Sequence, residues 1–207
     1  MFTIRMRVLK DDKYRSILQA ARKEFIEKGF KDASMRSIAK DSDVGLSNIY
    51  NYFTSKDEIF LEIVAPARND LFAFVKEKHT EKYIDFDFMS TLAYQEDTVD
   101  VYIQLLIKYK EEIRLLLFHS QGSTMENFRE SLTEYLTDVS NNHKTIVKKY
   151  YPQMHEVSSF FTHTLCAFMV SIVGEIVTHD MDKQKIREFF KEYFRFQIAG
   201  WRELTGI

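Results

Sequence analysis

Side chains that can read the edges of nucleic acid bases gather in one short stretch of this 207-residue chain: Leu46, Ser47, Asn48 and Asn51. An asparagine can form two hydrogen bonds with adenine, a serine hydroxyl can donate or accept, and a leucine can meet the thymine methyl group. Any one of these residues alone would also suit an ordinary solvated surface. Together, on one short helix, they suit a DNA groove and indicate recognition rather than catalysis.

Groups suited to phosphate lie beside them. Tyr50 and Tyr52 offer hydroxyl groups, and Lys56 offers a positive charge. Lys56 also stands at the expected N-terminus of a further helix, where free backbone amides and the helix dipole favour an anion. The segment therefore offers contacts to both the bases and the backbone of DNA.

Two short helices joined by a tight turn are expected to position these groups. Small and apolar residues at helical spacing mark the buried face of the first helix, over residues 34–42: Met35, Ile38, Ala39 and Ser42. Ser34 is expected to cap this helix. Gly45 is expected in the turn, because glycine reaches backbone angles that strain other residues. The second helix is expected over residues 46–53.

Flanking helices complete the predicted unit. Residues 11–28, ended by Gly29, are expected to pack across the pair, and Ser55 with Glu58 forms a capping box that opens the following helix. Two short helices in this arrangement make a helix-turn-helix, which places its second helix in the DNA major groove.

Specific motifs in this segment carry a resemblance to a known family. They are Gly29-Phe30, SMRSIA at residues 34–39, IYNYF at residues 49–53 and SKDEIF at residues 55–60. The segment resembles the DNA-binding domain of the TetR family of bacterial regulators. It departs from the family pattern at Gly45, where the family usually has a serine that caps the recognition helix.

The resemblance implies two sets of DNA contacts. The positions that match backbone contacts in the family are Ser34, Tyr50, Tyr52 and Lys56. The positions that match base contacts are Leu46, Ser47, Asn48 and Asn51.

Charge is distributed unevenly along the chain. Residues 1–56 hold 12 Lys and Arg against 7 Asp and Glu, and the remainder holds 17 against 24, within a net charge of −2. A basic head on an acidic body suits a protein that touches a polyanion with one end. Residues 1–10, with three basic side chains, are expected to form either an arm that reaches DNA or a frayed tail.

Helix-breaking residues are scarce, with 6 Gly and 2 Pro. Long runs of 3.6-residue periodicity accompany this scarcity, which predicts an all-α fold of about nine helices. Residues 1–54 are expected to form a three-helix, helix-turn-helix DNA-binding domain, and residues 55–207 a helical regulatory and dimerisation domain. The later helices are expected over 55–79, 85–94, 98–119 with a break near Tyr109 and Lys110, 124–150, 153–179 and 182–204. Pro66, inside the first of these, predicts either a hinge or a static kink.

The resemblance further implies a small-molecule cavity in the body. The candidate lining residues are Phe72, Phe88, Met89, Tyr102, Leu106, Tyr109, Phe118, Phe128, Phe161, Phe168 and Met169. A cavity of this composition would suit an apolar or aromatic effector, although each residue would equally suit a core.

The last two helices are implied to form a homodimer. Each carries an apolar band too wide for a single partner helix, which suits a four-helix bundle between two chains. The candidate interface residues are Phe160, Ile172, Ile176, Phe190, Phe194 and Trp201. A monomer core is the alternative.

Sequence patterns of catalysis are not found. There is no GxSxG, P-loop, HExxH or Rossmann glycine pattern, no histidine pair at i, i+4, and a single cysteine, Cys166. We therefore expect neither an enzyme, nor a cofactor, nor a metal site. The N-terminus lacks the apolar core of a signal peptide, and no apolar run is expected to span a bilayer, which predicts a cytoplasmic protein without a membrane partner.

These observations favour a ligand-responsive dimeric regulator, expected to be a repressor, that binds palindromic operator DNA and is released by a small effector. The alternative is a helical sensor or a module for a protein partner, in which DNA binding serves only as a platform.

Overall fold

The structure, a computed structural model, describes residues 2–179 and 181–207, and their side chains except those of residues 2–10 and Phe86. These residues form ten α-helices and one short 3-10 helix, and no strand occurs among them. The all-α expectation is confirmed. The backbone of residues 2–10 belongs to the first helix, but the side chains on which an N-terminal arm would depend lie outside the described part.

The chain divides into two compact units. The first contains the residues up to Pro66 together with Glu111–Phe128, and the second contains Ala67–Lys110 and Arg129–Ile207. Contacts therefore divide the chain at Pro66, whereas the sequence suggested a functional boundary after residue 54. They also bring a distant segment, residues 111–128, into the unit that holds the helix-turn-helix.

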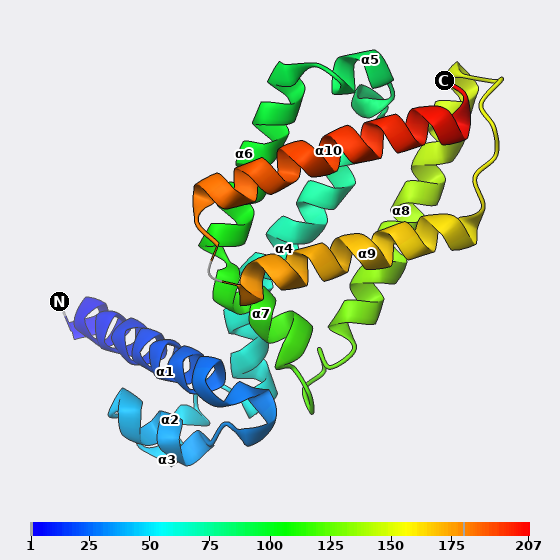
Figure 1. Ribbon diagram of the computed structural model, residues 1–207. Helices are drawn as coiled ribbons and strands as arrows, with labels where there is room; N and C mark the ends of the chain where they lie inside the picture. Colours follow the sequence, from blue (N-terminus) through cyan, green and yellow to red (C-terminus); the bar gives the residue numbers. More distant parts are fainter. Residues whose placement is uncertain (1, 180) are drawn as a thin grey trace. The chain divides into compact units, whose positions relative to one another are not determined.

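The first unit is built from α1 (Phe2–Asp32), α2 (Met35–Ser42), α3 (Leu46–Ile49), the beginning of α4 (Lys56–Lys78) and α7 (Lys110–Phe118). In Figure 1, α1 lies across α2 and α3. The fully buried side chains come from each of the first four helices: Ile17, Phe25, Ile38, Ile49 and Phe60. This small core fixes the helix-turn-helix.

Gly29 interrupts α1 as the sequence predicted. Its φ of 74° is accessible to glycine at little cost. Directly after this break the Phe30 amide donates to the His119 carbonyl at 2.9 Å. The segment after α7 is thereby fastened to the end of α1.

The second unit contains the end of α4, η1 (Glu81–Tyr83), α5 (Phe86–Met89), α6 (Leu92–Lys108), α8 (Phe128–Tyr150), α9 (Ser159–Thr178) and α10 (Lys183–Thr205). The long helices α9 and α10 run beside each other (Figure 1). Polar caps set several helix starts: Thr91 for α6, Ser158 for α9 and Asp182 for α10. Asp180, expected in the same turn as Asp182, lies outside the described residues.

Helix boundaries differ from the sequence-based ones where caps or turns intervene. The helix expected over 153–179 begins only at Ser159, because residues 151–158 are not helical. The helix expected over 98–119 begins earlier, at Leu92, and the break expected near Tyr109 is present, since its φ of −118° and ψ of 23° end α6. The helix expected over 124–150 begins at Phe128, after a series of turns.

The apolar helix α9 corrects one further expectation. It has 20 residues and a mean hydropathy of 1.7, so its length and composition alone would allow it to span a membrane. The core helices of soluble proteins can have the same length and hydropathy. Here Val170, Val173 and Val177 are buried within the second unit.

Candidate functional site

Helix α1 holds both ends of α2. Near the start of α2, the buried Glu24 carboxylate accepts hydrogen bonds from the Ser34 amide and the Lys28 ammonium, both at 2.9 Å. Burial acts to raise the pKa of Glu24, but the bonds from Lys28 and Ser34 outweigh it and lower that pKa. At the end of α2, the Ser16 hydroxyl donates to the Ser42 carbonyl at 2.8 Å. The orientation of α2 therefore depends on side chains of α1.

The turn between α2 and α3 uses a different residue from the one expected. Asp43 has a φ of 54°, and its amide donates to the carbonyls of Ala39 and Lys40. Gly45 has an ordinary φ of −54° and ψ of 140°. The expectation that Gly45 supplies the special backbone angles is wrong, because aspartate also tolerates the left-handed conformation and does so here.

Helix α3 is shorter than the predicted 46–53. Its helical part covers Leu46–Ile49, and the next residues continue as tight turns, with the Asn51 amide on the Asn48 carbonyl at 3.1 Å. Bonds of this i to i+3 type commonly tighten a helix end. Gly45 occupies the N-cap without a side-chain hydrogen bond.

The predicted base-contacting residues share one outer surface of this turn. Ser47 and Asn51 are exposed, Leu46 and Asn48 are partly exposed, and Ile49 is buried beneath them. The Asn51 amide group donates to the Asn48 side-chain carbonyl at 3.2 Å. The structure thus brings the four residues together, and their contact with DNA stays a prediction.

The predicted phosphate-contacting residues differ in how accessible their side chains are to a ligand. Tyr50 is 50% exposed, and Tyr52 and Ser34 are partly exposed. The Ser34 hydroxyl accepts from the Arg36 amide at 3.3 Å, which confirms it as the N-cap of α2. These three side chains remain accessible to a ligand.

The Lys56 side chain forms its hydrogen bonds within the protein. Its ammonium group donates to the carbonyls of Phe30 at 2.6 Å, Ala33 at 3.0 Å and Lys31 at 3.3 Å, and it lies 4.4 Å from the centroid of the Phe30 ring. Burial lowers the pKa of Lys56, and the charges of Asp32 and Glu24 oppose this effect. Because an ammonium group has three N–H donors, Lys56 holds the α1–α2 connection and has no donor left for a phosphate.

The start of α4 follows the predicted capping box with one change. The Glu58 amide donates to the Ser55 hydroxyl at 3.1 Å, and the Glu58 carboxylate accepts from the hydroxyl of Thr54 at 2.7 Å and from its amide. The return bond therefore reaches Thr54 instead of Ser55. These bonds lower the pKa of Glu58.

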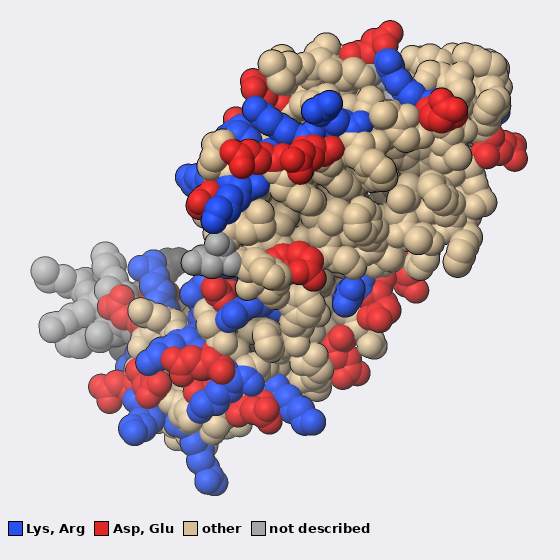
Figure 2. Space-filling model, in the orientation of Figure 1, with Lys and Arg blue, Asp and Glu red and all other residues tan. Residues whose placement is uncertain are grey.

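Basic residues that the sequence analysis did not assign lie on the same unit. Lys31, Arg36 and Lys40 are exposed around α2. Figure 2 shows Lys and Arg side chains interspersed with acidic ones over the part of the surface where α2 and α3 lie. The helical spacing of Arg36 and Lys40 from the buried Ile38 could have indicated their outward position.

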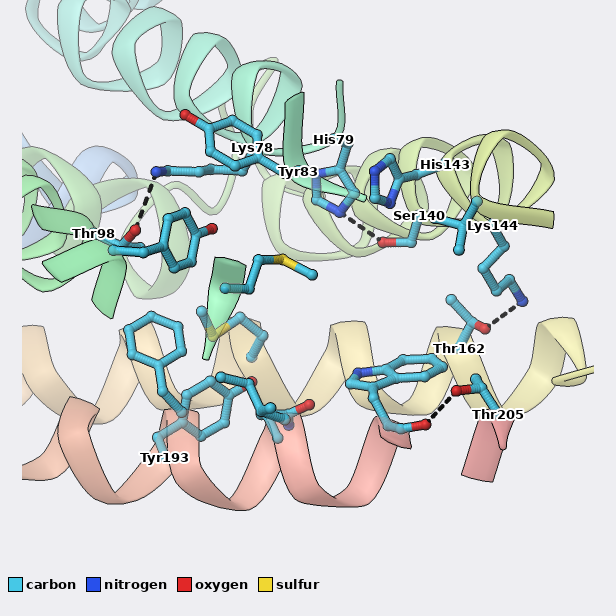
Figure 3. A pocket seen from close by; sticks show the side chains of 18 of the residues that line it. Lys78, His79, Tyr83, Thr98, Ser140, His143, Lys144, Thr162, Tyr193 and Thr205 are labelled. Carbon is cyan, nitrogen blue, oxygen red and sulfur yellow. Dashed lines mark hydrogen bonds between the residues drawn. The ribbon is translucent and has the colours of Figure 1, made fainter. Parts of the chain in front are cut away.

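A cavity of about 310 Å³ lies in the second unit, between residues of α4, α6, α8, α9 and α10 (Figure 3). Three of the predicted lining residues do line it: Met89, Tyr102 and Met169. The Tyr102 hydroxyl group is buried, and this burial raises its pKa. The other predicted lining residues lie elsewhere.

Their positions explain the difference. Phe118 and Phe128 belong to the first unit, and Phe72 and Leu106 pack elsewhere in the second. The Tyr109 hydroxyl donates to Asp70 at 2.7 Å. Phe88, Phe161 and Phe168 are 43 to 49% exposed. An apolar side chain alone does not reveal which way its helix turns it, so the list mixed core, surface and cavity residues.

Polar residues of α4 and α8 complete the cavity and were missed: Lys78, His79, Ser140, His143 and Lys144. The sequence signal for these residues was their place on the inner faces of long helices, where polar side chains also line a cavity.

The predicted dimer residues also separate into groups. Phe160 is 80% exposed, whereas Ile172, Ile176 and Phe190 are buried in the core of the protomer. Phe194 and Trp201 are partly exposed and line the cavity, and Trp201 also borders the groove between α9 and α10. Buried side chains stabilise this chain and present no surface to a partner, so the expected interface is corrected at Ile172, Ile176 and Phe190 and stays a prediction at the other positions.

Other apolar side chains on the same two helices are exposed: Phe161 and Phe168 on α9, and Phe196 and Leu204 on α10. Phe161 and Leu204 border a shallow groove between the two helices. Figure 2 shows a broad surface with few charges over α9 and the C-terminal part of α10. We call the residues Phe160, Phe161, Phe168, Phe196 and Leu204 the α9–α10 face.

A three-helix head that exposes a short helix with Ser, Asn and Tyr side chains, joined to a helical body with a cavity, defines the class of helix-turn-helix DNA-binding regulators. Comparison with known proteins agrees. A protein-family model described as bacterial regulatory proteins of the tetR family matches residues 17–63. Residues 17–63 therefore match the DNA-binding domain of this family, and the chain is similar to helix-turn-helix transcriptional regulators.

One relative matches a short segment of this chain, and another matches most of its length. An uncharacterised helix-turn-helix transcriptional regulator of Bacillus subtilis, YhgD, is 42% identical over 52 residues, which are 25% of this chain and 27% of that protein. A second such regulator, from Haemophilus influenzae, is 24% identical over 86% of this chain and 82% of its own length.

A solved structure shows the same fold. NalD of Pseudomonas aeruginosa, described as the secondary repressor of the MexAB-OprM multidrug efflux pump, superposes with a TM-score of 0.59 at 16% identity. The match covers 89% of this chain and 94% of NalD.

Proposed function

We propose that this regulator is a cytoplasmic homodimeric repressor of palindromic operator DNA, released when a small molecule fills the cavity of the second unit. One observation carries the proposal: a DNA-binding head and a partly enclosed cavity coexist in one chain and share the helix α4. NalD, of the same fold, is itself named a repressor. No catalytic role is proposed.

The DNA-binding half of the proposal is tested with DNA from upstream of the regulator's own gene. We expect fluorescence anisotropy at moderate salt to show tighter binding to this DNA than to random DNA, and binding that weakens steeply as salt rises. The variant Asn51→Ala should lose discrimination at one position of each half-site, at about 1–3 kcal/mol. Equal affinity for both DNAs would leave the second candidate, a sensor or partner-binding module that uses DNA only as a platform.

Dimerisation through the α9–α10 face would give the two heads of a palindrome reader. Five large apolar side chains are exposed on these two helices, three of them around one groove, and clustered exposed apolar side chains commonly mark a protein–protein interface. In a two-fold homodimer, the commonest arrangement, the same apolar face of a second copy would cover these side chains.

Helix α4 would carry the signal between the cavity and the head. It runs from Lys56, which holds the α1–α2 connection, to Lys78 on the cavity wall. Pro66 lies at the boundary between the two units and removes one backbone hydrogen bond from the helix. An effector acts on such a helix only through a difference in its affinity for the two head arrangements.

A further inference from the structure

Four basic side chains lie along one side of the cavity. Lys78 and His79 come from the end of α4, and His143 and Lys144 come from α8 (Figure 3). Among the described residues that line the cavity none is Asp or Glu. The cavity therefore concentrates positive charge and hydrogen-bond donors without an acidic partner of its own.

Lys78 has partial compensation within the protein. Its ammonium group donates to the Thr98 hydroxyl at 3.2 Å and lies 4.6 Å and 5.2 Å from the ring centroids of Tyr83 and Tyr94. The negative faces of aromatic rings attract a cation. Lys78 is thus held in an aromatic cage.

Lys144 has only neutral partners. Its ammonium group donates to the Thr162 hydroxyl at 2.7 Å and to the Val157 carbonyl at 3.0 Å. Burial lowers the pKa of Lys144, so the surroundings disfavour its charge. Because a third N–H donor remains, an anion beside Lys144 would both accept that hydrogen and offset the cost of the partly buried charge.

Lys144 stands where the cavity meets the protein surface. Lys144 and Met154 line both the cavity and a neighbouring surface groove, which also carries Lys148, Lys149 and one acidic residue, Glu156. A charged group could stay at this mouth while the rest of a ligand enters. Inside, α10 supplies apolar and aromatic side chains: Phe194, Ile198 and Trp201.

The two histidines are compatible with an anionic ligand. The His79 Nδ1 atom lies 2.7 Å from the Val75 carbonyl and therefore carries its proton, which leaves Nε2 to accept from the Ser140 hydroxyl at 3.1 Å. Burial lowers the pKa of both His79 and His143. A neighbouring anion would favour their protonated forms, so the histidines add no obstacle to it.

We propose that the effector is an amphipathic anion, with a carboxylate or phosphate head held by Lys144 at the cavity mouth and an apolar body lying against Phe194 and Trp201. The inference rests on the proposed function of the cavity and adds the charge of the ligand. A volume of about 310 Å³ is near the lower end of the roughly 300–1,000 Å³ usual for ligand pockets, so the body is small.

The test compares ligands that share one alkyl chain and differ in the charge of the head group: decanoate is anionic, 1-decanol is neutral and decylammonium is cationic. The single tryptophan of the chain lines the cavity, so its fluorescence reports binding to the full-length protein without DNA. We expect decanoate to bind at least tenfold more tightly than decanol, and decylammonium to bind most weakly. Decyl phosphate in a fourth arm distinguishes a phosphate head from a carboxylate.

Variants of the protein then test whether Lys144 binds the anionic head group. Lys144→Met should remove the preference for decanoate over decanol, and Lys144→Arg should restore it. Lys76→Met, at an exposed position of α4 that lines neither the cavity nor the groove, is the matched control and should change neither affinity. A preference that survives Lys144→Met, or decanol that binds as tightly as decanoate, overturns the anion inference.

The same experiment separates this inference from the proposed function. If decanol binds as well as decanoate and either releases the protein from DNA, the cavity is an effector site but the ligand need not be an anion. If none of the four ligands changes the tryptophan fluorescence or DNA binding, both the anionic head and this cavity as the effector site are contradicted for bodies of that size.

Discussion

All three hydrogens of the Lys56 ammonium group have backbone acceptors, at Phe30, Lys31 and Ala33. Hydrogen bonds to charged groups contribute about 1.5–3 kcal/mol each, so the first consequence of removing this group is on the fold of the head. We predict that Lys56→Met lowers the free energy of unfolding by about 2 kcal/mol or more and weakens DNA binding as a result. Urea unfolding followed by circular dichroism measures this.

The exposed Lys40 on α2 provides the control for Lys56. Lys40→Met should unfold like the unchanged protein. If Lys56→Met also unfolds like the unchanged protein yet binds DNA poorly, Lys56 acts on the phosphates directly, as the sequence resemblance first implied.

Gly45 is free to change, because a Cβ atom there would meet nothing within 4 Å and its φ of −54° is ordinary. We predict that Gly45→Ser stabilises the head by a few tenths of a kcal/mol, since a serine hydroxyl can cap α3 where glycine cannot. Gly45→Ala, which adds the Cβ without the hydroxyl, should lack this gain. A clear loss of stability in both variants would show that the turn requires glycine after all.

At the scale of elements, the end of α4 and α8 meet through two partly buried histidines, His79 and His143, whose ring centroids lie 5.5 Å apart. Burial lowers the pKa of both from the ordinary 6.5, and for His143 the charge of His79 adds to this. The unfolded chain therefore binds protons at a higher pH than the folded one. Stability should be complete above the ordinary histidine pKa and fall as the pH drops through it toward the folded pKa.

Urea midpoints at about pH 7.5 and about pH 5.5 measure this pH dependence. His143→Gln should reduce the loss between the two values, because it removes one of the buried titrating groups. His163→Gln, at an exposed position of α9, is the control and should leave the loss in place. An undiminished loss in His143→Gln would contradict the role given to the buried pair.

Pro66 tests whether α4 transmits the signal by bending. The helix is continuous from Lys56 to Lys78, and the two compact units divide at this proline. A proline inside a helix costs about 3 kcal/mol relative to alanine, so we predict that Pro66→Ala stabilises the protein and weakens the release of DNA by effector. If stability rises while release is unchanged, Pro66 is a static kink.

The elements were predictable from sequence to the extent that local chemistry determines them. Caps such as Ser34 and the capping box at Ser55 and Glu58 depend on neighbours in the chain, and the structure bears them out. The cavity was not predictable in the same way. Whether Phe161 faces outward and Lys144 inward depends on how helices distant in sequence rotate against each other, which apolar periodicity alone does not determine.

At the scale of the whole molecule, the α9–α10 face decides how many heads reach the operator. Phe196 is 66% exposed on this face, so a charge there would not disturb the protomer core but would be buried and unpaired in a dimer. We predict that Phe196→Glu is a monomer by light scattering and binds palindromic DNA about a hundredfold or more weakly, since it loses the effective concentration of a linked second head.

Leu92, 64% exposed at the start of α6, provides a matched control for the charge and its exposure. Leu92→Glu should remain a dimer and bind the palindrome normally. On a single half-site, where one head suffices, Phe196→Glu should bind as well as the unchanged protein. This last comparison separates lost dimerisation from a damaged head, because only damage to the head would weaken half-site binding. A dimeric Phe196→Glu would place the interface on another surface.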